Sequence, residues 1–163
     1  MRNKVLTAAL GFALIVAAPA LAEATQARSR VEVDFLKPEQ FPDVRYAVLD
    51  ELKTYLVERA QGVVPPDQTL VVEITDVRLA GTYEWWRTPG MPSFRVIQDA
   101  TPPRITLRFT LFDASGGVLS RGERVLIDQN FVGQSLVHLV GPLRYEKALL
   151  DRWLATEFRS QPT

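Results

Sequence analysis

Two long strand-like stretches, one on each side of an aromatic loop, constrain the fold of this chain most. They are Leu70–Gly81 and Pro102–Asp113, and both are rich in β-branched and aromatic residues. Apolar and polar residues alternate cleanly along the second stretch, so Leu107 and Phe109 are predicted to share one buried face. We expect the remaining segments to complete a sheet around this pair and to cover one of its faces.

The first stretch carries apolar residues on both of its faces, which is typical of a strand inside a sheet. Simple alternation places Ile74 on one face and Val77 on the other. Gly81 is expected to mark a bulge or a sharp bend where this strand ends. A second bulge is expected at Gly122, which interrupts the alternation of the returning strand Val118–Asp128.

The flanking segments predict one more strand and two helices. Val31–Leu36 alternates with a period of two residues. Val44–Ala60 has apolar residues at three- and four-residue steps, with Asp43 as a candidate N-cap or first-turn acid and Gly62 as a candidate stop. A final helix is expected to begin at Gly141-Pro142, because proline suits the first helical turn.

The order of these elements predicts an α+β fold. We expect a two-layer sandwich, in which a mostly antiparallel sheet of four to five strands carries two helices on one face. The elements follow one another as β-α-β-β-β-α. A helix between the first two strands indicates a right-handed crossover and a parallel pair.

The first 22 residues have the pattern of a cleaved signal peptide. Arg2 and Lys4 precede the apolar run Val5–Ala18, and Ala20-Leu21-Ala22 fits a signal peptidase site. Residues 23–163 then form a single domain. We expect it in the periplasm, with secretion as the alternative, and it has no second apolar run of membrane-spanning length.

Composition narrows the chemistry further. The chain has no cysteine, which excludes a lipid-bearing cysteine and disulfides. Removing Arg2 and Lys4 from 19 basic residues leaves 17 against 19 acidic residues, a net charge of −2. Nucleic acid is therefore not an expected partner, because no basic stripe exists to bind phosphates.

Several segments together resemble a family of exported proteobacterial proteins, domain-of-unknown-function family number three thousand and sixteen. The segments that carry the resemblance are Val31–Phe35, Phe41–Asp43, Thr75–Gly81, Arg95-Val96, Pro102–Ile105 and Tyr145–Trp153. The resemblance implies an exported domain and assigns it no activity. The expected architecture is also similar to small envelope proteins that assist outer-membrane assembly, such as the lipopolysaccharide-assembly lipoprotein.

Candidate catalytic groups are few. His138 is the single histidine, and Ser135 lies near it without a nucleophile elbow. No metal site and no cofactor are expected. A hydrolase of saccharides or peptides would need facing carboxylates, for which Asp76, Glu84 and Asp99 are the candidates. The alternative is that Asp76 pairs with a nearby arginine: Arg78, Arg104 or Arg108.

The candidate binding residues are Trp85, Trp86, Arg104 and Arg108. Adjacent residues of a strand point to opposite sides, so one indole of Trp85-Trp86 is expected in the core and the other at a contact surface. The arginines share one strand face and suit a carboxylate or phosphate. Their alternative role is cross-strand pairing with Glu73 or Glu123.

These observations favour a non-enzymatic periplasmic domain with a binding or envelope-accessory role. Its partner would be an unidentified protein or cell-envelope component, bound through the open sheet face and the aromatic loop. The hydrolase and a small-ligand carrier with an aromatic pocket are the two alternatives.

Overall fold

The computed structural model describes residues 29–41, 44–84, 95–134, 136 and 138–158. The elements within these ranges are β1 (Arg30–Phe35), η1 (Pro38–Gln40), α1 (Tyr46–Gln61), β2 (Thr69–Arg78), β3 (Thr82–Tyr83), β4 (Arg95–Val96), β5 (Arg104–Phe112), β6 (Val118–Ile127), η2 (Phe131–Gly133) and α2 (Arg144–Phe158). The four long strands and both helices that the sequence predicts are all present.

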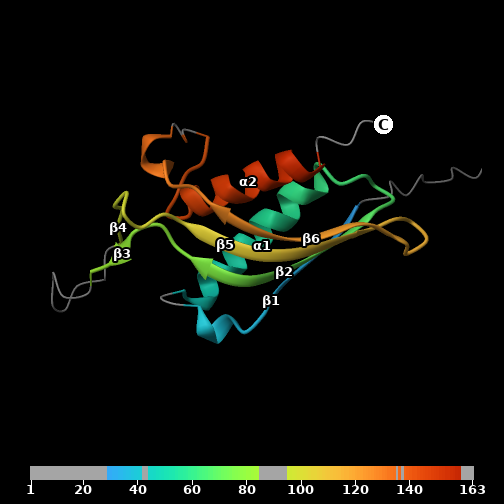
Figure 1. Cartoon of the computed structure of the whole chain (residues 1–163), viewed down its shortest axis with the longest axis horizontal. Coiled ribbons are helices and arrows are strands. Elements are labelled where there is room, and N and C mark those ends of the chain that lie inside the picture. Colours follow the sequence, from blue (N-terminus) through green and yellow to red (C-terminus); the bar gives the residue numbers. More distant parts are fainter. Residues whose placement is uncertain (1–28, 42–43, 85–94, 135, 137, 159–163) are drawn as a thin grey trace, which may run out of the picture.

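The long strands form one mixed sheet in the order β1-β2-β5-β6, with both helices on one of its faces (Figure 1). β1 runs parallel to β2, and the other neighbours are antiparallel. The predicted α+β fold is therefore confirmed. β3 and β4 form a separate two-stranded ribbon, which extends from one end of the sheet.

The parallel pair follows from the α1 crossover. Leu49, Leu52, Leu56 and Ala60 recur at helical spacing and are all buried, which explains why this segment folds over the sheet. α1 begins at Tyr46, two residues later than the sequence predicts. Asp43, the expected N-cap, lies outside the described residues. The expected stop is confirmed: Gly62 is the C-cap residue, and its N–H bonds back to the last turn.

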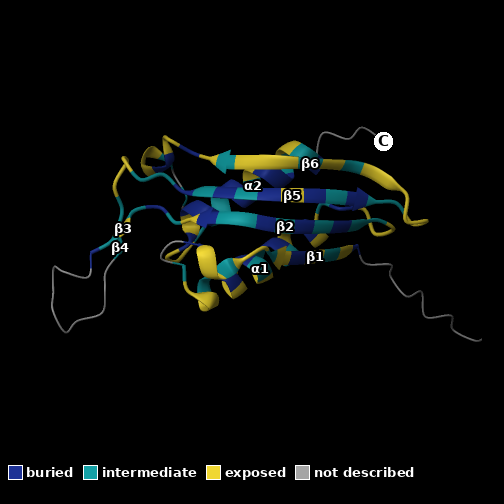
Figure 2. Ribbon diagram, turned by 60° about the horizontal axis from the view of Figure 1, so that its bottom comes forward, coloured by how far each residue is buried: buried dark blue, intermediate teal, exposed yellow. Residues whose placement is uncertain are grey.

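The core lies between the helices and the sheet. Three aromatic rings meet at its centre, where Phe109 of β5 stands edge-to-face against Trp153 and Phe158 of α2. α2 begins at Arg144, two residues after Pro142 and so later than the sequence predicts. Its apolar side chains Leu150, Trp153, Leu154 and Phe158 are buried, and so is Leu143 just before the helix. Most fully buried side chains of the sheet belong to β2 and β5, which Figure 2 shows as the two central, most buried strands, and β1 adds Val33.

One prediction about β2 was wrong. A bulge between Ile74 and Asp76 shifts the register against β5, so alternation restarts at this point. Val77 therefore returns to the same buried face as Ile74, although simple alternation places it on the opposite face. The same bulge turns Asp76 and Arg78 toward the open face. Thr75, at the bulge, donates its hydroxyl to the carbonyl of Thr106.

The predicted bulge at Gly122 was also wrong. Gly122 pairs regularly with Phe109, and the irregularity of β6 lies near Leu119, where Leu111 pairs with Ser120 and Phe112 with Val118. Glycine is instead favoured at position 122 because a Cβ atom there would crowd the ring of Phe109, at a distance of 3.2 Å.

The two helices are joined by polar as well as by apolar contacts. Asp151 of α2 accepts hydrogen bonds at 2.8 Å from the hydroxyl of Tyr55 and from Nε of Arg59, both on α1. Burial, followed by the bond to Asp151, raises the pKa of the Tyr55 phenol well above its ordinary value. The phenol is therefore a permanent donor at physiological pH.

Candidate functional site: an arginine pocket at the open sheet face

The sheet face opposite the helices carries no helix of the described chain. Its centre is an ion-pair ladder across three strands, because Arg108 of β5 contacts Glu123 of β6 at 3.2 Å and Glu73 of β2 at 3.5 Å. All three side chains are exposed, so the ladder contributes little to stability. These contacts confirm the alternative prediction for Arg108, which was cross-strand pairing with Glu73 or Glu123.

A second arginine cluster lies at the end of this face. Arg78 of β2 and Arg104 of β5 are direct cross-strand partners, which places two like charges opposite each other. The carboxylate of Asp76 relieves the repulsion, since one of its oxygens lies 2.7 Å from Arg104 Nη2 and 3.6 Å from Arg78 Nε. The bulge in β2 is what brings Asp76 to this face.

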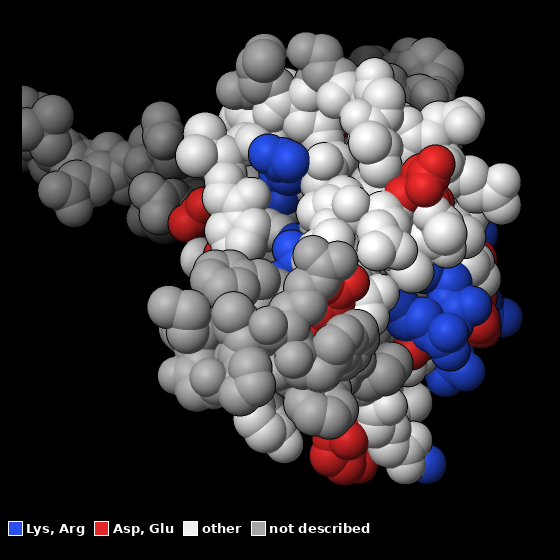
Figure 3. Space-filling model, turned by 90° about the vertical axis from the view of Figure 1, so that its left-hand side faces the viewer, with Lys and Arg blue, Asp and Glu red and all other residues white. Residues whose placement is uncertain are grey.

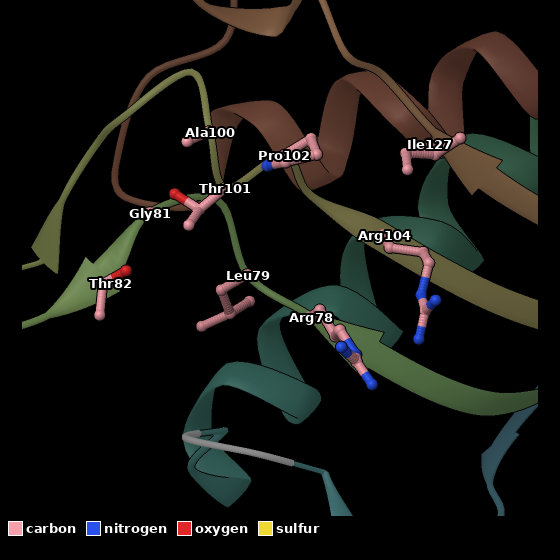
Figure 4. A pocket seen from close by; sticks show the side chains of 9 residues that line it. All are labelled: Arg78, Leu79, Gly81, Thr82, Ala100, Thr101, Pro102, Arg104 and Ile127. Carbon is pink, nitrogen blue, oxygen red and sulfur yellow. The ribbon is translucent and has the colours of Figure 1, made fainter.

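The two arginines line a pocket of about 370 Å³ between the sheet and the base of the ribbon. In Figure 4 their side chains extend from two neighbouring strands to the same side. The other lining residues are small or apolar side chains and two threonines: Leu79, Gly81, Thr82, Ala100, Thr101, Pro102 and Ile127. Figure 3 views the molecule from this end and shows basic side chains gathered in one patch with acidic side chains beside it.

The pocket has unused capacity to donate hydrogen bonds. Two guanidinium groups face a single described carboxylate, so one positive charge is not neutralised within the cluster. Nε of Arg104 is buried and has no hydrogen-bond partner among the described residues. Such a group costs free energy unless a partner satisfies it. The arrangement is therefore suited to a carboxylate or phosphate, which arginine binds with two parallel N–H donors.

The wall of the pocket is shaped by Gly81. Its φ of 78° lies in the left-handed region, and a Cβ would collide with the carbonyl of Val96 on β4. The N–H of Gly81 donates to the carbonyl of Thr101 at 2.9 Å. The sharp bend that the sequence predicts at Gly81 is therefore confirmed, and it turns the chain from β2 into the ribbon.

A buried glutamate that sequence reasoning missed fixes the ribbon. Glu146 of α2 is fully buried, and its Oε1 accepts hydrogen bonds from the N–H of Ala80 at 2.7 Å and from Arg95 of β4 at 3.1 Å. Burial raises the pKa of Glu146, and the charge of Arg95 opposes that rise. The sequence does contain a signal for the burial of Glu146, because it lies three residues after Leu143 and four before Leu150, on the apolar face of the helix.

The other predicted site residues are spread over the molecule. Asp76 pairs with arginine, as the alternative interpretation expects. Glu84 is buried after β3, Asp99 is exposed in the turn after β4, and His138 is exposed before α2. Trp85 and Trp86 lie outside the described residues, so the prediction that one indole is buried stays a prediction.

The described ranges contain neither a candidate metal site nor a candidate membrane-spanning helix. No group of three or more histidine, cysteine, aspartate or glutamate side chains is arranged to hold a metal ion there. No helix in these ranges is long and apolar enough to cross a membrane.

Comparison with solved structures gives matches at low sequence identity. A PelC dodecamer from Paraburkholderia phytofirmans matches with 12% identity and a TM-score of 0.42, over 86% of this chain and 93% of that chain. A minor lipoprotein from Acinetobacter baumannii matches with 11% identity and a TM-score of 0.31, over 82% of this chain and 91% of that chain.

Comparison with known sequences places the chain in a family without an assigned activity. No curated protein matches it. The family model described as "Protein of unknown function (DUF3016)" matches residues 29–156, which include both helices almost entirely, all six strands and the arginine pocket. The chain therefore belongs to the DUF3016 family of proteins of unknown function.

Proposed function

We propose that this protein is a non-enzymatic binding domain of the periplasm, which holds an anionic group of an envelope partner in the pocket of Arg78 and Arg104. The observation that carries the proposal is the excess positive charge of Arg78 and Arg104, which share one carboxylate among the described residues. A carboxylate or phosphate in the pocket would neutralise this charge. The signal-peptide pattern of residues 1–22 supports the location.

The chemistry of the pocket favours binding over hydrolysis. The carboxylate nearest the arginines, Asp76, is already engaged by Arg104 at 2.7 Å. Arginine stays protonated at physiological pH and cannot act as a base. The remaining polar side chains of the pocket, Thr82 and Thr101, can donate or accept hydrogen bonds to orient a ligand.

The remaining candidate residues fit the same proposal as secondary contacts. Arg108 lies on the same face as Arg104, four residues further along β5, and is shared by two glutamates. We therefore expect a smaller contribution from it. Trp85 and Trp86 follow Glu84 directly in the chain, and we propose that one indole of the pair contacts the partner.

A titration with small anions tests the pocket. We expect inorganic phosphate and succinate to bind in a saturable way and to shift the side-chain Nε–H resonance of Arg104 in a 15N-resolved NMR spectrum. Arg104→Ala should weaken phosphate binding at least about tenfold, equivalent to about 1.4 kcal/mol. Arg104→Lys should lose nearly as much, because lysine cannot offer two parallel donors.

The matched control is Arg30→Ala. Arg30 is an exposed arginine of the edge strand β1, and its ion pair with Glu32 is 3.6 Å long. The substitution removes the same charge, so an equal loss of phosphate binding would reveal a general charge effect and contradict the proposal. Anion binding that survives in Arg104→Ala would contradict it too.

The source of the anionic group needs a second measurement. Affinity capture from periplasm with wild-type protein and with Arg104→Ala separates a macromolecular partner from a free anion. A partner that is captured by the wild type and lost in the variant supports the accessory role. Saturable binding of phosphate without any captured partner would instead support the carrier alternative.

A further inference from the structure

β6 is a long edge strand with exposed apolar side chains. It ends the sheet in the described part of the chain, it is ten residues long and it contains no proline. Large apolar side chains are exposed along it, with Leu119 at 52% and Val125 at 60% exposure. Figure 2 shows β6 as the most exposed long strand of the sheet. The unpaired backbone groups of such an edge can pair with another strand.

The opposite edge of the sheet has a different character. β1 is six residues long, and its outward residues are Arg30, Glu32 and Asp34, which are all charged. Charged residues and short length are features that block edge pairing. β6 carries charges too, at Arg121, Glu123 and Arg124, but it is longer and exposes apolar side chains beside them.

We propose that β6 pairs antiparallel with β6 of a second copy of this chain, with the twofold axis at Gly122. In this register Arg121 of each copy stands opposite Glu123 of the other, so two cross-strand pairs of opposite charge form by symmetry. Regular pairing extends from Ser120 to Arg124 of each copy, because the irregularity of β6 lies at Leu119. The charge pattern of β6 is thus complementary to itself.

Neighbouring registers lack this complementarity. An axis at Arg121 places two arginines opposite each other, and an axis at Glu123 does the same with two glutamates. Like charges directly opposite in a sheet are destabilising. Registers centred between two residues turn one sheet over, because side chains alternate between faces. An axis at Gly122 therefore pairs opposite charges and also keeps the helices of both copies on the same side of the sheet.

The resulting dimer would be one continuous eight-stranded sheet. Both helix layers lie on the same side, since the register keeps the faces aligned. Ile127, which lines the arginine pocket, lies five residues from the axis at Gly122 in each copy. The two pockets then open on the same face at opposite ends, roughly 33 Å apart at about 3.3 Å per residue. The inference itself depends only on β6 and not on what the pockets bind.

Charge reversal with mixing tests the register. The wild-type protein should form a concentration-dependent dimer in sedimentation velocity. Arg121→Glu places glutamates opposite each other, and Glu123→Arg places arginines opposite each other. Each variant alone should raise the dimer dissociation constant at least about tenfold. An equimolar mixture should recover a dimer, because the substituted charges are again complementary across the axis.

Folding is checked by circular dichroism, since Glu123 also contacts the exposed Arg108. A second readout is hydrogen exchange: outward-facing amides of β6 should exchange more slowly at high protein concentration. A wild type that stays monomeric at about 100 µM overturns the proposal. A mixture that fails to associate while the wild type dimerises overturns the register. A monomer whose captured partner is lost in Arg121→Glu would assign the edge to a strand of another protein, and it overturns the self-pairing as well.

Discussion

Replacing Phe109 with alanine should lower the free energy of unfolding by about 3–5 kcal/mol, because truncating a buried aromatic leaves a cavity in the core. Phe109 is 2% exposed, and its ring centroid lies 5.7 Å from that of Trp153 and 6.0 Å from that of Phe158. Edge-to-face contacts of this kind add to the loss of buried area. Urea unfolding, followed by tryptophan fluorescence and circular dichroism, measures the change.

The matched control for Phe109 is Tyr46→Ala. Tyr46 is also aromatic but is 67% exposed in the first turn of α1, so its removal should change stability by less than about 0.5 kcal/mol. An effect of that small size for Phe109→Ala would show that the buried face of β5 is assigned wrongly.

Replacing Glu146 with alanine should also cost about 3–5 kcal/mol, because it breaks a buried ion pair from one side. The guanidinium of Arg95, whose side chain is 9% exposed, would lose its described carboxylate. The N–H of Ala80, a fully buried residue, would lose its acceptor. The double variant with Arg95→Ala should be less unstable than the sum of the two single changes. If the loss of stability in the double variant equals the sum of the two single losses, Glu146 and Arg95 are not coupled and the prediction is wrong.

Glu51→Ala is the control for Glu146. Glu51 forms an ion pair of 2.6 Å with Lys147, the residue next to Glu146, but its carboxylate is 44% exposed. We expect a cost of at most about 1 kcal/mol, since surface pairs are solvated and screened. Urea unfolding of both variants separates the effect of burial from that of charge.

The raised pKa of Glu146 also predicts a pH dependence. Between its ordinary value in the unfolded chain and its higher value in the fold, the folded protein binds more protons than the unfolded chain. The contribution of this carboxyl to stability therefore falls as the pH rises through that interval, and it is constant above it. Glu146→Gln should remove this component from the pH dependence of the free energy of unfolding.

The order of the elements was predictable because each has a local signal. Alternation along β5 and helical spacing along α1 depend only on neighbouring residues, so Phe109 and Leu52 were assigned to the core correctly. The bulge near Thr75 has no such signal, since β-branched residues are also typical of regular strands. Its position is set by pairing with β5, and the face of Val77 was therefore predicted wrongly.

The candidate site was predictable only in part. Arg104 lies in the pocket, and the pairing of Asp76 with arginine was among the alternatives. Arg78 enters the site through the cross-strand register, which a single sequence does not specify. Glu146 was missed because a charged residue is normally expected on the solvated face of a helix. Its role depends on Arg95, which is 51 residues away in the chain.

The parallel pairing of β1 with β2 sets an expected order of folding. β5 and β6 are joined by the tight turn Asp113–Gly117, so their pairing closes a short loop. β1 reaches β2 only after residues 36–68 have formed the α1 crossover, which is a slower, non-local closure. In pulsed hydrogen exchange during refolding, amides of β5 and β6 should gain protection before those of β1. The N-terminal strand would then be the last part of the sheet to close and the first to detach.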